Sequence, residues 1–175
     1  MRRIEPLSRT DHNREGFDCG DGDLNAFLRQ YAAQQADRGV SRTFVLIDDQ
    51  DNVPREVIGF FTFRPYEIQR SQLPNSAQSG YPNTIGAYLL MKLAVGKPQQ
   101  GHGIATMLLR EVFRRVIALM DQGGGAGLFV DAKNAQLVDF YINRGFTRLA
   151  QTSLSLYIPR HTLAKIVEST PTPTF

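Results

Sequence analysis

The segment from residue 88 to residue 120 constrains the fold of this 175-residue chain more than any other. Tyr88–Val95 (YLLMKLAV) is a continuous apolar run, typical of a buried strand, and the glycine-containing stretch GKPQQGHG follows it. A helix is then predicted from Gly103 to Met120, because apolar residues recur there at helical spacing. A strand that leads through glycines into a long amphipathic helix indicates an α/β fold. The apolar stripe of the helix consists of Ile104, Met107, Leu108, Val112, Val116, Leu119 and Met120.

The rest of the chain alternates strand and helix patterns in the same way. Thr43–Ile47 and Val57–Phe63 flank a short polar turn, so we predict that they form a hairpin. Gln69–Thr84 is the longest predicted loop, and it could line the pocket of the acceptor substrate, cover a partner interface or be disordered. Together these patterns predict one mixed α/β domain. The other predicted elements are strands at Arg3–Leu7, Gly127–Asp131, Phe146–Leu149 and Ser153–Ile158, and helices at Asp23–Gln35 (capped from the Asp21/Asp23 region) and Ala135–Arg144.

Composition excludes several classes of protein. Hydrophobic residues make up 42% of the chain, which is enough for a packed core and excludes an intrinsically disordered protein. No apolar run approaches 18 residues and no apolar segment follows the basic N-terminus, so we expect neither a membrane span nor a secretory signal. The single cysteine, Cys19, excludes an internal disulfide and fits a reducing cytoplasm, and three dispersed histidines indicate no metal site. The net charge of +3 is compatible with a polyanionic partner.

The glycine pair in Gln100–Ala105 (QGHGIA) lies between the predicted strand and helix. Backbone N–H groups at a helix start attract phosphate oxygens, and glycine allows the backbone to approach a ligand closely. Two known phosphate motifs do not fit: G-x-G-x-x-G would need glycine in place of Thr106, and G-x-x-x-x-G-K-[ST] does not occur. A plain strand-to-helix turn is the alternative. The pattern favours a phosphate ester that is neither an NAD-type nor a P-loop nucleotide.

The pattern [QR]-x-x-G-x-[GA], here Gln100, Gly103 and Ala105 after the strand KLAV, resembles the acyl-CoA signature of the Gcn5-related N-acetyltransferase (GNAT) superfamily. The resemblance covers roughly residues 40–158. It implies a mixed, mostly antiparallel central sheet flanked by helices. It also implies a single domain over residues 1–160, with a partly disordered tail over residues 161–175.

The same resemblance implies acetyl-CoA as the cosubstrate and no metal. In that superfamily the pyrophosphate of CoA sits on the N–H groups of the loop, and the pantetheine arm pairs with the preceding strand like an added strand. A backbone N–H, that of Val95, can then polarise the thioester carbonyl. The implied cofactor-binding residues are Leu93, Ala94, Val95, Gln100, Gly101, His102, Gly103, Ile104 and Ala105.

The sequence FYINRGF at residues 140–146 resembles the FY-x-x-x-GF segment of the superfamily, in which a tyrosine commonly lies near the acyl-CoA sulfur; here it is Tyr141. A phenol with a pKa of about 10 is protonated at neutral pH and can act as general acid for the departing thiolate. The alternative is that Tyr141 packs with Leu137 and Val138 on the inner face of a helix. Asn134, just before this helix, can cap it or, by the resemblance, contact CoA.

Four further motifs are FDCG with LNAFL at residues 17–28, RTFV at 42–45, VDAKN at 130–134 and LYIP at 156–159. They resemble the GNAT toxins of bacterial toxin–antitoxin pairs, and this resemblance spans about residues 15–160. Members of that family acetylate the α-amine of the amino acid on charged tRNA, which blocks translation. The resemblance implies a ribbon–helix–helix antitoxin as partner, a homodimer and a cytoplasmic location. Lys92 is a departure, since many relatives carry arginine before LAV.

The central strand carries Lys92 and no Glu or Asp that could act as general base. Deprotonating a lysine side chain at neutral pH costs about 4 kcal/mol, whereas an α-amine costs about 1 kcal/mol. A site without a base therefore suits an aminoacyl ester, although Glu67 or a water chain is an alternative base. Lys92 flanks the pantetheine strand and is our candidate contact to tRNA phosphates.

These features predict a toxin N-acetyltransferase that moves acetyl from acetyl-CoA to aminoacyl-tRNA. One alternative is a GNAT enzyme for a small amine or a protein N-terminus. Another is a CoA-binding or antitoxin-binding module without turnover, against which Tyr141 argues. Cys19 is expected to be a small buried side chain, and Phe60, Phe61 and Phe63 are expected to pack in the core or at a dimer contact.

Overall fold

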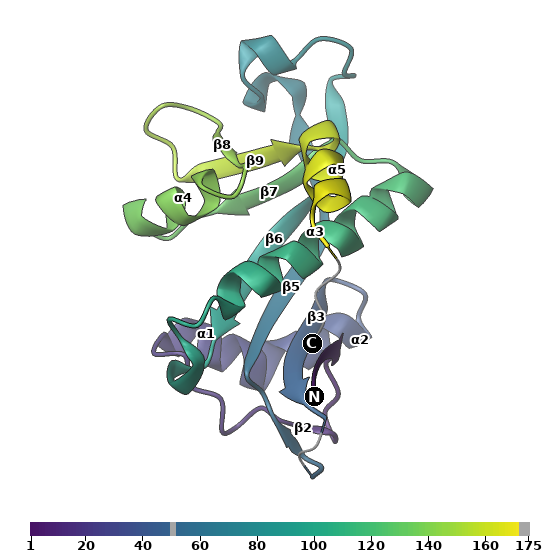
Figure 1. The fold of residues 1–175 in the computed structure, drawn as a ribbon. Helices are drawn as coiled ribbons and strands as arrows, with labels where there is room; N and C mark the ends of the chain where they lie inside the picture. The colour runs from purple at the N-terminus through teal and green to yellow at the C-terminus, as the bar shows by residue number, and fades with distance from the viewer. Residues whose placement is uncertain (50–51, 172–175) are drawn as a thin grey trace. The chain divides into compact units, whose positions relative to one another are not determined.

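Seven strands form the main sheet of the protein, in the order β1–β3–β5–β6–β7–β9–β8 (Figure 1). This computed structural model describes residues 1–49 and 52–171. The pairings that we describe below are antiparallel except for β6 with β7, which confirms the predicted mixed, mostly antiparallel α/β fold. The strands are β1 (Arg2–Pro6), β3 (Arg42–Asp48), β5 (Gly59–Gln69), β6 (Thr84–Val95), β7 (Gly127–Asp131), β8 (Thr147–Arg148) and β9 (Ser155–Pro159).

The chain divides into two compact units. Unit 1 contains Met1–Arg64 and Met91–Val112, and unit 2 contains Pro65–Leu90 and Phe113–Pro171. The helices are α1 (Gly22–Ala26), the π-helical turn η1 (Phe27–Tyr31), α2 (Ala32–Asp37), α3 (Ile104–Gly123), α4 (Ala135–Ile142) and α5 (Arg160–Ser169). Three 3-10 turns complete the set: η2 (Arg70–Gln72), η3 (Asn75–Ala77) and η4 (Lys97–Gln99).

Unit 1 is built on the predicted hairpin. β3 pairs antiparallel with β5, from Arg42↔Phe63 to Leu46↔Gly59, and with β1 on its other side. Phe60 and Phe61 are fully buried and Phe63 nearly so, which places the three phenylalanines in the core. The buried residues of one core cluster are Phe17, Phe27, Leu28, Ala32, Val45, Ile47, Val57, Phe60 and Ala94.

The helix predicted over Asp23–Gln35 is present as α1, η1 and α2 in succession. Asp21 caps its start, because its Oδ1 accepts hydrogen bonds from the backbone N–H groups of Asp23 (3.0 Å) and Leu24 (3.2 Å). The segment buries Phe27 and Leu28 against the hairpin. It ends before Gly39, whose φ of 69° is the left-handed conformation that often follows a helix.

Unit 2 is built around β7. This strand pairs antiparallel with β9, from Gly127↔Pro159 to Asp131↔Ser155, and parallel with β6. The loop predicted at residues 69–84 is shorter than expected, because β5 continues to Gln69 and β6 already begins at Thr84. Its turns are held by Leu73, which is buried in a cluster with Ile68, Ile85, Ala87, Phe129 and Tyr157.

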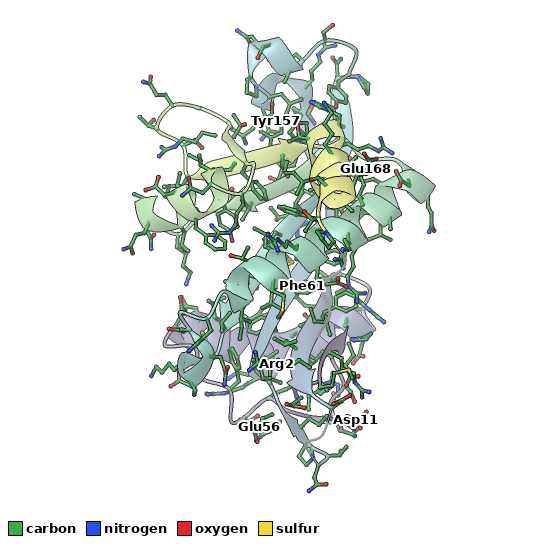
Figure 2. All side chains as sticks on the ribbon, viewed as in Figure 1. Arg2, Asp11, Glu56, Phe61, Tyr157 and Glu168 are labelled. Atoms are coloured by element: carbon green, nitrogen blue, oxygen red, sulfur yellow. The ribbon has the colours of Figure 1, made fainter. Side chains whose placement is uncertain are left out.

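Two features were not predicted from the sequence. Residues 161–169, expected in a tail, form most of α5, in which Leu163 is fully buried and Arg160 pairs with Asp121. The two-residue strands β2 (His12–Asn13) and β4 (Arg55–Glu56) pair in parallel, near the labelled Asp11 and Glu56 in Figure 2. The strands β2 and β4 have two residues each, which is too short for hydrophobic periodicity to reveal them. In α5, Leu163, Ile166 and Val167 do follow helical spacing, but the helix start has no side-chain cap. Within the described residues, no helix is long and apolar enough to cross a membrane.

Gly59 is a position where packing in unit 1 requires glycine. A Cβ there would lie 2.9 Å from the carbonyl oxygen of Ala94 and 3.0 Å from a methyl group of Leu108. We expect Gly59→Ala to lower the free energy of unfolding by about 1–3 kcal/mol, because the strand must shift to admit the methyl group. Chemical denaturation measures this change. Gly86→Ala, where a Cβ has open space, is the control, and an equal loss in both variants would contradict the packing argument.

Candidate active site

The glycine loop between β6 and α3 lies entirely in unit 1. Gly101 and Gly103 have φ values of 79° and 78°, a left-handed conformation that glycine adopts without strain. A Cβ at either position would meet nothing within 4 Å, so backbone conformation and not space explains these glycines. Gly101, His102 and Gly103 are exposed, and α3 begins at the buried Ile104. The first-turn N–H groups of a helix lack intrahelical partners, which makes this helix start a suitable cradle for phosphate oxygens.

The last residues of β6, before the loop, have apolar side chains that are largely buried. Ala94 and Val95 are buried and Leu93 is half-buried. The parallel register of β6 with β7 runs from Tyr88↔Leu128 to Leu90↔Val130, so Leu93–Val95 lie beyond it along β6. A ligand that pairs with main-chain groups needs no polar side chain at these positions.

Gln100 joins the loop to two other segments of unit 1. Its Nε2 donates hydrogen bonds to the carbonyl oxygens of Val95 and Cys19, each at 2.9 Å. One bond closes the loop onto the end of β6, and the other ties it to the segment before α1. The glutamine of the acyl-CoA signature therefore has a structural role in shaping the loop.

The FDCG segment contacts the other side of the same loop. The Asp18 carboxylate pairs with Lys97 Nζ at 2.7 Å, and the backbone N–H of Lys97 donates to the Asp18 carbonyl at 2.9 Å. Asn25 Nδ2 donates to Asp18 at 2.9 Å, while Asn25 Oδ1 accepts from the Cys19 N–H at 3.0 Å. We call this set of five residues the loop brace: Asp18, Cys19, Asn25, Lys97 and Gln100.

The protonation states in the loop brace follow from these contacts. The Lys97 ammonium holds the pKa of Asp18 well below its usual range, helped by hydrogen bonds from the Gly20 N–H and Asn25. Asp18 in turn raises the pKa of Lys97. Burial raises the pKa of the Cys19 thiol, which donates to Asn25 Oδ1 at 3.2 Å. Cys19 is only half-buried, where a buried side chain was expected, and its raised pKa favours the protonated thiol over the reactive thiolate.

In the sequence, the FDCG and LN motifs are a resemblance only, and they indicate no role for Asp18, Asn25 or Lys97. The contacts join residues up to 81 positions apart, which no spacing rule brings together. Gly20 is a local signal for the turn in this segment, since its φ of 87° is a left-handed conformation that favours glycine.

Lys92 is half-buried on β6, and its Nζ lies 5.5 Å from the centre of the Phe27 ring. A cation over an aromatic face gains roughly 0.5–1 kcal/mol at partly exposed sites. The buried Phe27 thus fixes where the Lys92 charge lies in unit 1. The contact to tRNA predicted for Lys92 stays a prediction.

Tyr141 lies on α4 in unit 2 and is only 6% exposed. Its ring meets those of Phe140 and Phe146 edge to face, with centroids 5.1 and 5.3 Å away. Val138 is buried on the same helix, whereas Leu137 is exposed, so the predicted packing of Tyr141 holds for Val138 and is wrong for Leu137. Burial raises the pKa of Tyr141 to about 12. The phenol is therefore protonated throughout the neutral range, as a proton donor must be.

Asn134 caps α4. Its backbone is extended, and its Oδ1 accepts a hydrogen bond from the Leu137 N–H at 2.9 Å. This confirms the capping interpretation of Asn134. The second interpretation, a contact to CoA, stays a prediction.

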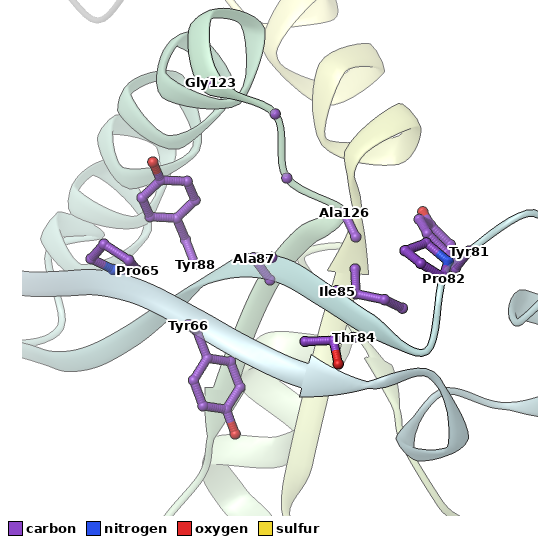
Figure 3. Close-up of a pocket in the computed structure, with 13 residues that line it drawn as sticks. Pro65, Tyr66, Tyr81, Pro82, Thr84, Ile85, Ala87, Tyr88, Gly123 and Ala126 are labelled. Atoms are coloured by element: carbon purple, nitrogen blue, oxygen red, sulfur yellow. The ribbon is translucent and has the colours of Figure 1, made fainter.

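Unit 2 also contains a cavity of about 460 Å³ (Figure 3). Tyr81 and Pro82 of the predicted loop line it beside Ile85, and Tyr66 and Tyr88 come from β5 and β6. The loop at residues 69–84 therefore contributes to a pocket wall in unit 2, and its role in lining the acceptor pocket stays a prediction.

The structure thus brings together one part of the predicted site. In unit 1 the loop residues Gln100–Ala105 are separated from Lys92–Val95 only by Gly96 and η4, and the loop brace holds them. Tyr141 and Asn134 belong to unit 2, and their place in the site stays a prediction.

Comparison with known proteins gives an acetyltransferase family. The family model described as "Acetyltransferase (GNAT) family" matches residues 9–146. Among curated proteins, the chain is 26% identical to a probable toxin TacT of Sinorhizobium fredii (strain NBRC 101917 / NGR234), with 95% of each chain covered. It is 28% identical to a tRNA-acetylating toxin of Mycobacterium tuberculosis (strain ATCC 25618 / H37Rv), with 74% of this chain and 75% of that protein covered.

Solved structures give the same likeness. A tyrosine-to-phenylalanine mutant of KacT is 30% identical with a TM-score of 0.87, covering 94% of this chain and 98% of that one. AtaT complexed with acetyl-methionyl-tRNAfMet is 28% identical with a TM-score of 0.86 and coverages of 95% and 99%. AtaTR bound with AcCoA is 28% identical with a TM-score of 0.81 and coverages of 94% and 97%.

Two Asn134 variants separate capping from cofactor contact. We expect Asn134→Ala to lower the free energy of unfolding by about 1 kcal/mol, and Asn134→Ser, which keeps a capping oxygen, to leave it nearly unchanged. If Asn134 also contacts CoA, both variants raise the Kd for acetyl-CoA, measured by calorimetry. A wild-type Kd in Asn134→Ser would contradict the contact and leave only the cap.

Proposed function

Because the chain belongs to the GNAT acetyltransferase family, whose model matches residues 9–146, we propose that it is a toxin that transfers acetyl from acetyl-CoA to the α-amine of aminoacyl-tRNA. The observation that carries the proposal is the braced glycine loop at the start of α3, with two glycines in the left-handed conformation. The acceptor class rests on relatives: one is a tRNA-acetylating toxin, and one was solved with acetyl-methionyl-tRNAfMet.

The loop fits the cosubstrate through its backbone. The exposed Gly101–Gly103 segment leaves the N–H groups at the start of α3 accessible to the pyrophosphate, with Ile104 and Ala105 in the first turn. Leu93, Ala94 and Val95 would pair with the pantetheine amides through main-chain groups. Gln100 would act indirectly, because its amide already bonds Val95 and Cys19.

Acetyl-CoA supplies the acetyl group as a thioester, whose carbonyl carbon is attacked by the amine nitrogen while the C–S bond breaks. The Val95 N–H would donate a hydrogen bond to the carbonyl oxygen as negative charge develops there. Tyr141 would assist the departing sulfur as general acid or hydrogen-bond donor. The attacking amine releases one proton to solvent, and solvent returns one to the phenolate or to the thiolate, so the products are the amide and the free thiol of CoA. The pKa of the phenol is about 12 and that of a thiol is about 8.5, so complete transfer of the proton to the thiolate is unfavourable. The phenol therefore assists mainly by donating a hydrogen bond.

The α-amine of an aminoacyl ester suits a site without a dedicated base. Such an amine is largely neutral near pH 8, so little energy is needed to present its lone pair. Lys92, held by Phe27, would contact the phosphates of the tRNA, and any such contact weakens with added salt.

The proposed function also implies a domain organisation, partners and a cellular location. We propose that both units form one acetyltransferase domain, since the family match runs through both. The predicted end of this domain at residue 160 is too early, because α5 continues to Ser169 and buries Leu163. A toxin needs neutralisation in its own host, which supports an antitoxin partner. We propose that this antitoxin is of the ribbon–helix–helix type. A homodimer and action in the cytoplasm, where charged tRNA is found, complete the proposal.

Labelled acetyl-CoA and total tRNA, charged or deacylated, test the proposed reaction. We expect label on charged tRNA only, released by mild base as an N-acetyl amino acid. Tyr141→Phe should lower kcat about 10²–10³-fold, because the group on which negative charge develops loses a hydrogen-bond donor. Tyr157→Phe, a second buried tyrosine of unit 2, should retain activity. Label on small amines or peptides with none on tRNA would contradict the proposed acceptor. Binding of acetyl-CoA without transfer to any amine would contradict the proposed enzymatic activity.

The raised pKa of Tyr141 sets the shape of the pH profile. A donor with a pKa of about 12 stays protonated at lower pH, so we expect kcat to rise with deprotonation of the amine and then to stay level up to pH 9. Initial rates between pH 6 and pH 9 measure this. A fall above pH 8 that disappears in Tyr141→Phe would contradict the buried, protonated phenol.

A further inference from the structure

We propose that Asn25 is a positioning residue for acetyl-CoA, which acts through Asp18 and Cys19 on the glycine loop. The inference rests on the proposed function, because it takes the loop to be the acetyl-CoA site. Asn25 itself does not touch the loop residues Gly101–Ala105 through any hydrogen bond that we describe; its effect passes through the loop brace.

Asn25 uses both ends of its amide. Its Oδ1 accepts from the Cys19 N–H at 3.0 Å and from the Cys19 thiol at 3.2 Å. Its Nδ2 donates to Asp18 Oδ1 at 2.9 Å. The residue is 9% exposed, so water has little access to replace these bonds. A fixed amide on α1 thereby sets the positions of two consecutive residues.

Those two residues hold the loop at three points. The Asp18 carboxylate pairs with Lys97 Nζ at 2.7 Å, and the Asp18 carbonyl accepts from the Lys97 N–H at 2.9 Å. The Cys19 carbonyl accepts from Gln100 Nε2, which also donates to Val95. Lys97 is the first residue of η4 and Gln100 follows its last, so the bonds fix both ends of the turn that precedes Gly101.

No other side chain of similar size provides this pattern. Aspartate would lose the donor and would place a second carboxylate beside Asp18, and leucine would lose both functions. The exposed Asp18 and the half-buried Cys19 would then lose the bonds that connect them to α1. The consequence for function is a loss of preorganisation. If the loop adopts its binding conformation for a smaller fraction of the time, the apparent Kd for acetyl-CoA rises by the same factor. The rate of transfer from the bound state is not affected.

The first test measures binding of acetyl-CoA by calorimetry, without any acceptor. We expect Asn25→Ala and Asn25→Asp to raise the Kd 10- to 100-fold, with kcat at saturating acetyl-CoA within threefold of wild type. Ser41→Ala is the matched control, since it breaks a polar contact to Gln35 at the far end of the same helical segment; its Kd should stay within twofold. Circular dichroism confirms that each variant is folded.

Asp18→Ala gives a second test at an exposed position, where folding is not at risk. Removing a carboxylate near an anionic ligand should tighten binding if only charge matters. If Asp18 instead acts by holding the loop, Asp18→Ala should raise the Kd for acetyl-CoA three- to tenfold. Tighter binding in Asp18→Ala, or an unchanged Kd in folded Asn25 variants, would overturn the positioning role alone. A wild-type protein that does not bind acetyl-CoA would overturn the proposed function, and the inference with it.

Discussion

The turn of the backbone between β6 and α3 is the constraint on which the site depends. A phosphate cradle at a helix start requires the chain to leave the strand and enter the helix without side chains over the N–H groups. Gly101 and Gly103 meet this requirement through their left-handed φ values. Glycine, however, adds conformational freedom, which a ligand must remove on binding. A loop with two such residues therefore depends on contacts from outside itself to keep its shape.

Those contacts explain why a motif near residue 20 belongs to a site near residue 100. Asp18 and Cys19 hold the two ends of the turn, and Asn25 holds Asp18 and Cys19. The network combines an exposed ion pair, which is weak by itself, with a buried amide that has no water to replace its partners. The geometry of the loop is thus set mainly by Asn25 and the backbone, and the charges of Asp18 and Lys97 reinforce it.

The sequence predicts the parts of this protein that depend on local pattern. Apolar runs identified the hairpin of β3 and β5, the strand β7 and the long helix α3, and the position of Asn134 before α4 predicted its capping role. The helix α5 was missed because its start has no side-chain cap and only Leu163 is fully buried on it. The loop brace was missed for another reason: Asp18 and Lys97 are 79 positions apart, and pairing over such a distance is fixed by the fold and not by spacing.

Tyr141 shows how burial and chemistry can serve the same purpose. A tyrosine packed between Phe140 and Phe146 has the appearance of an ordinary core residue, and the sequence alone favoured that interpretation when the loop was left aside. The same packing removes water from the phenol and raises its pKa to about 12, which keeps the proton on the oxygen. It also restricts the ring, so that the hydroxyl occupies a defined position on α4. A donor of this kind assists a leaving group best by hydrogen bonding as charge develops. The chemistry therefore requires little of this chain beyond a fixed hydroxyl, a backbone N–H and a loop that keeps its shape.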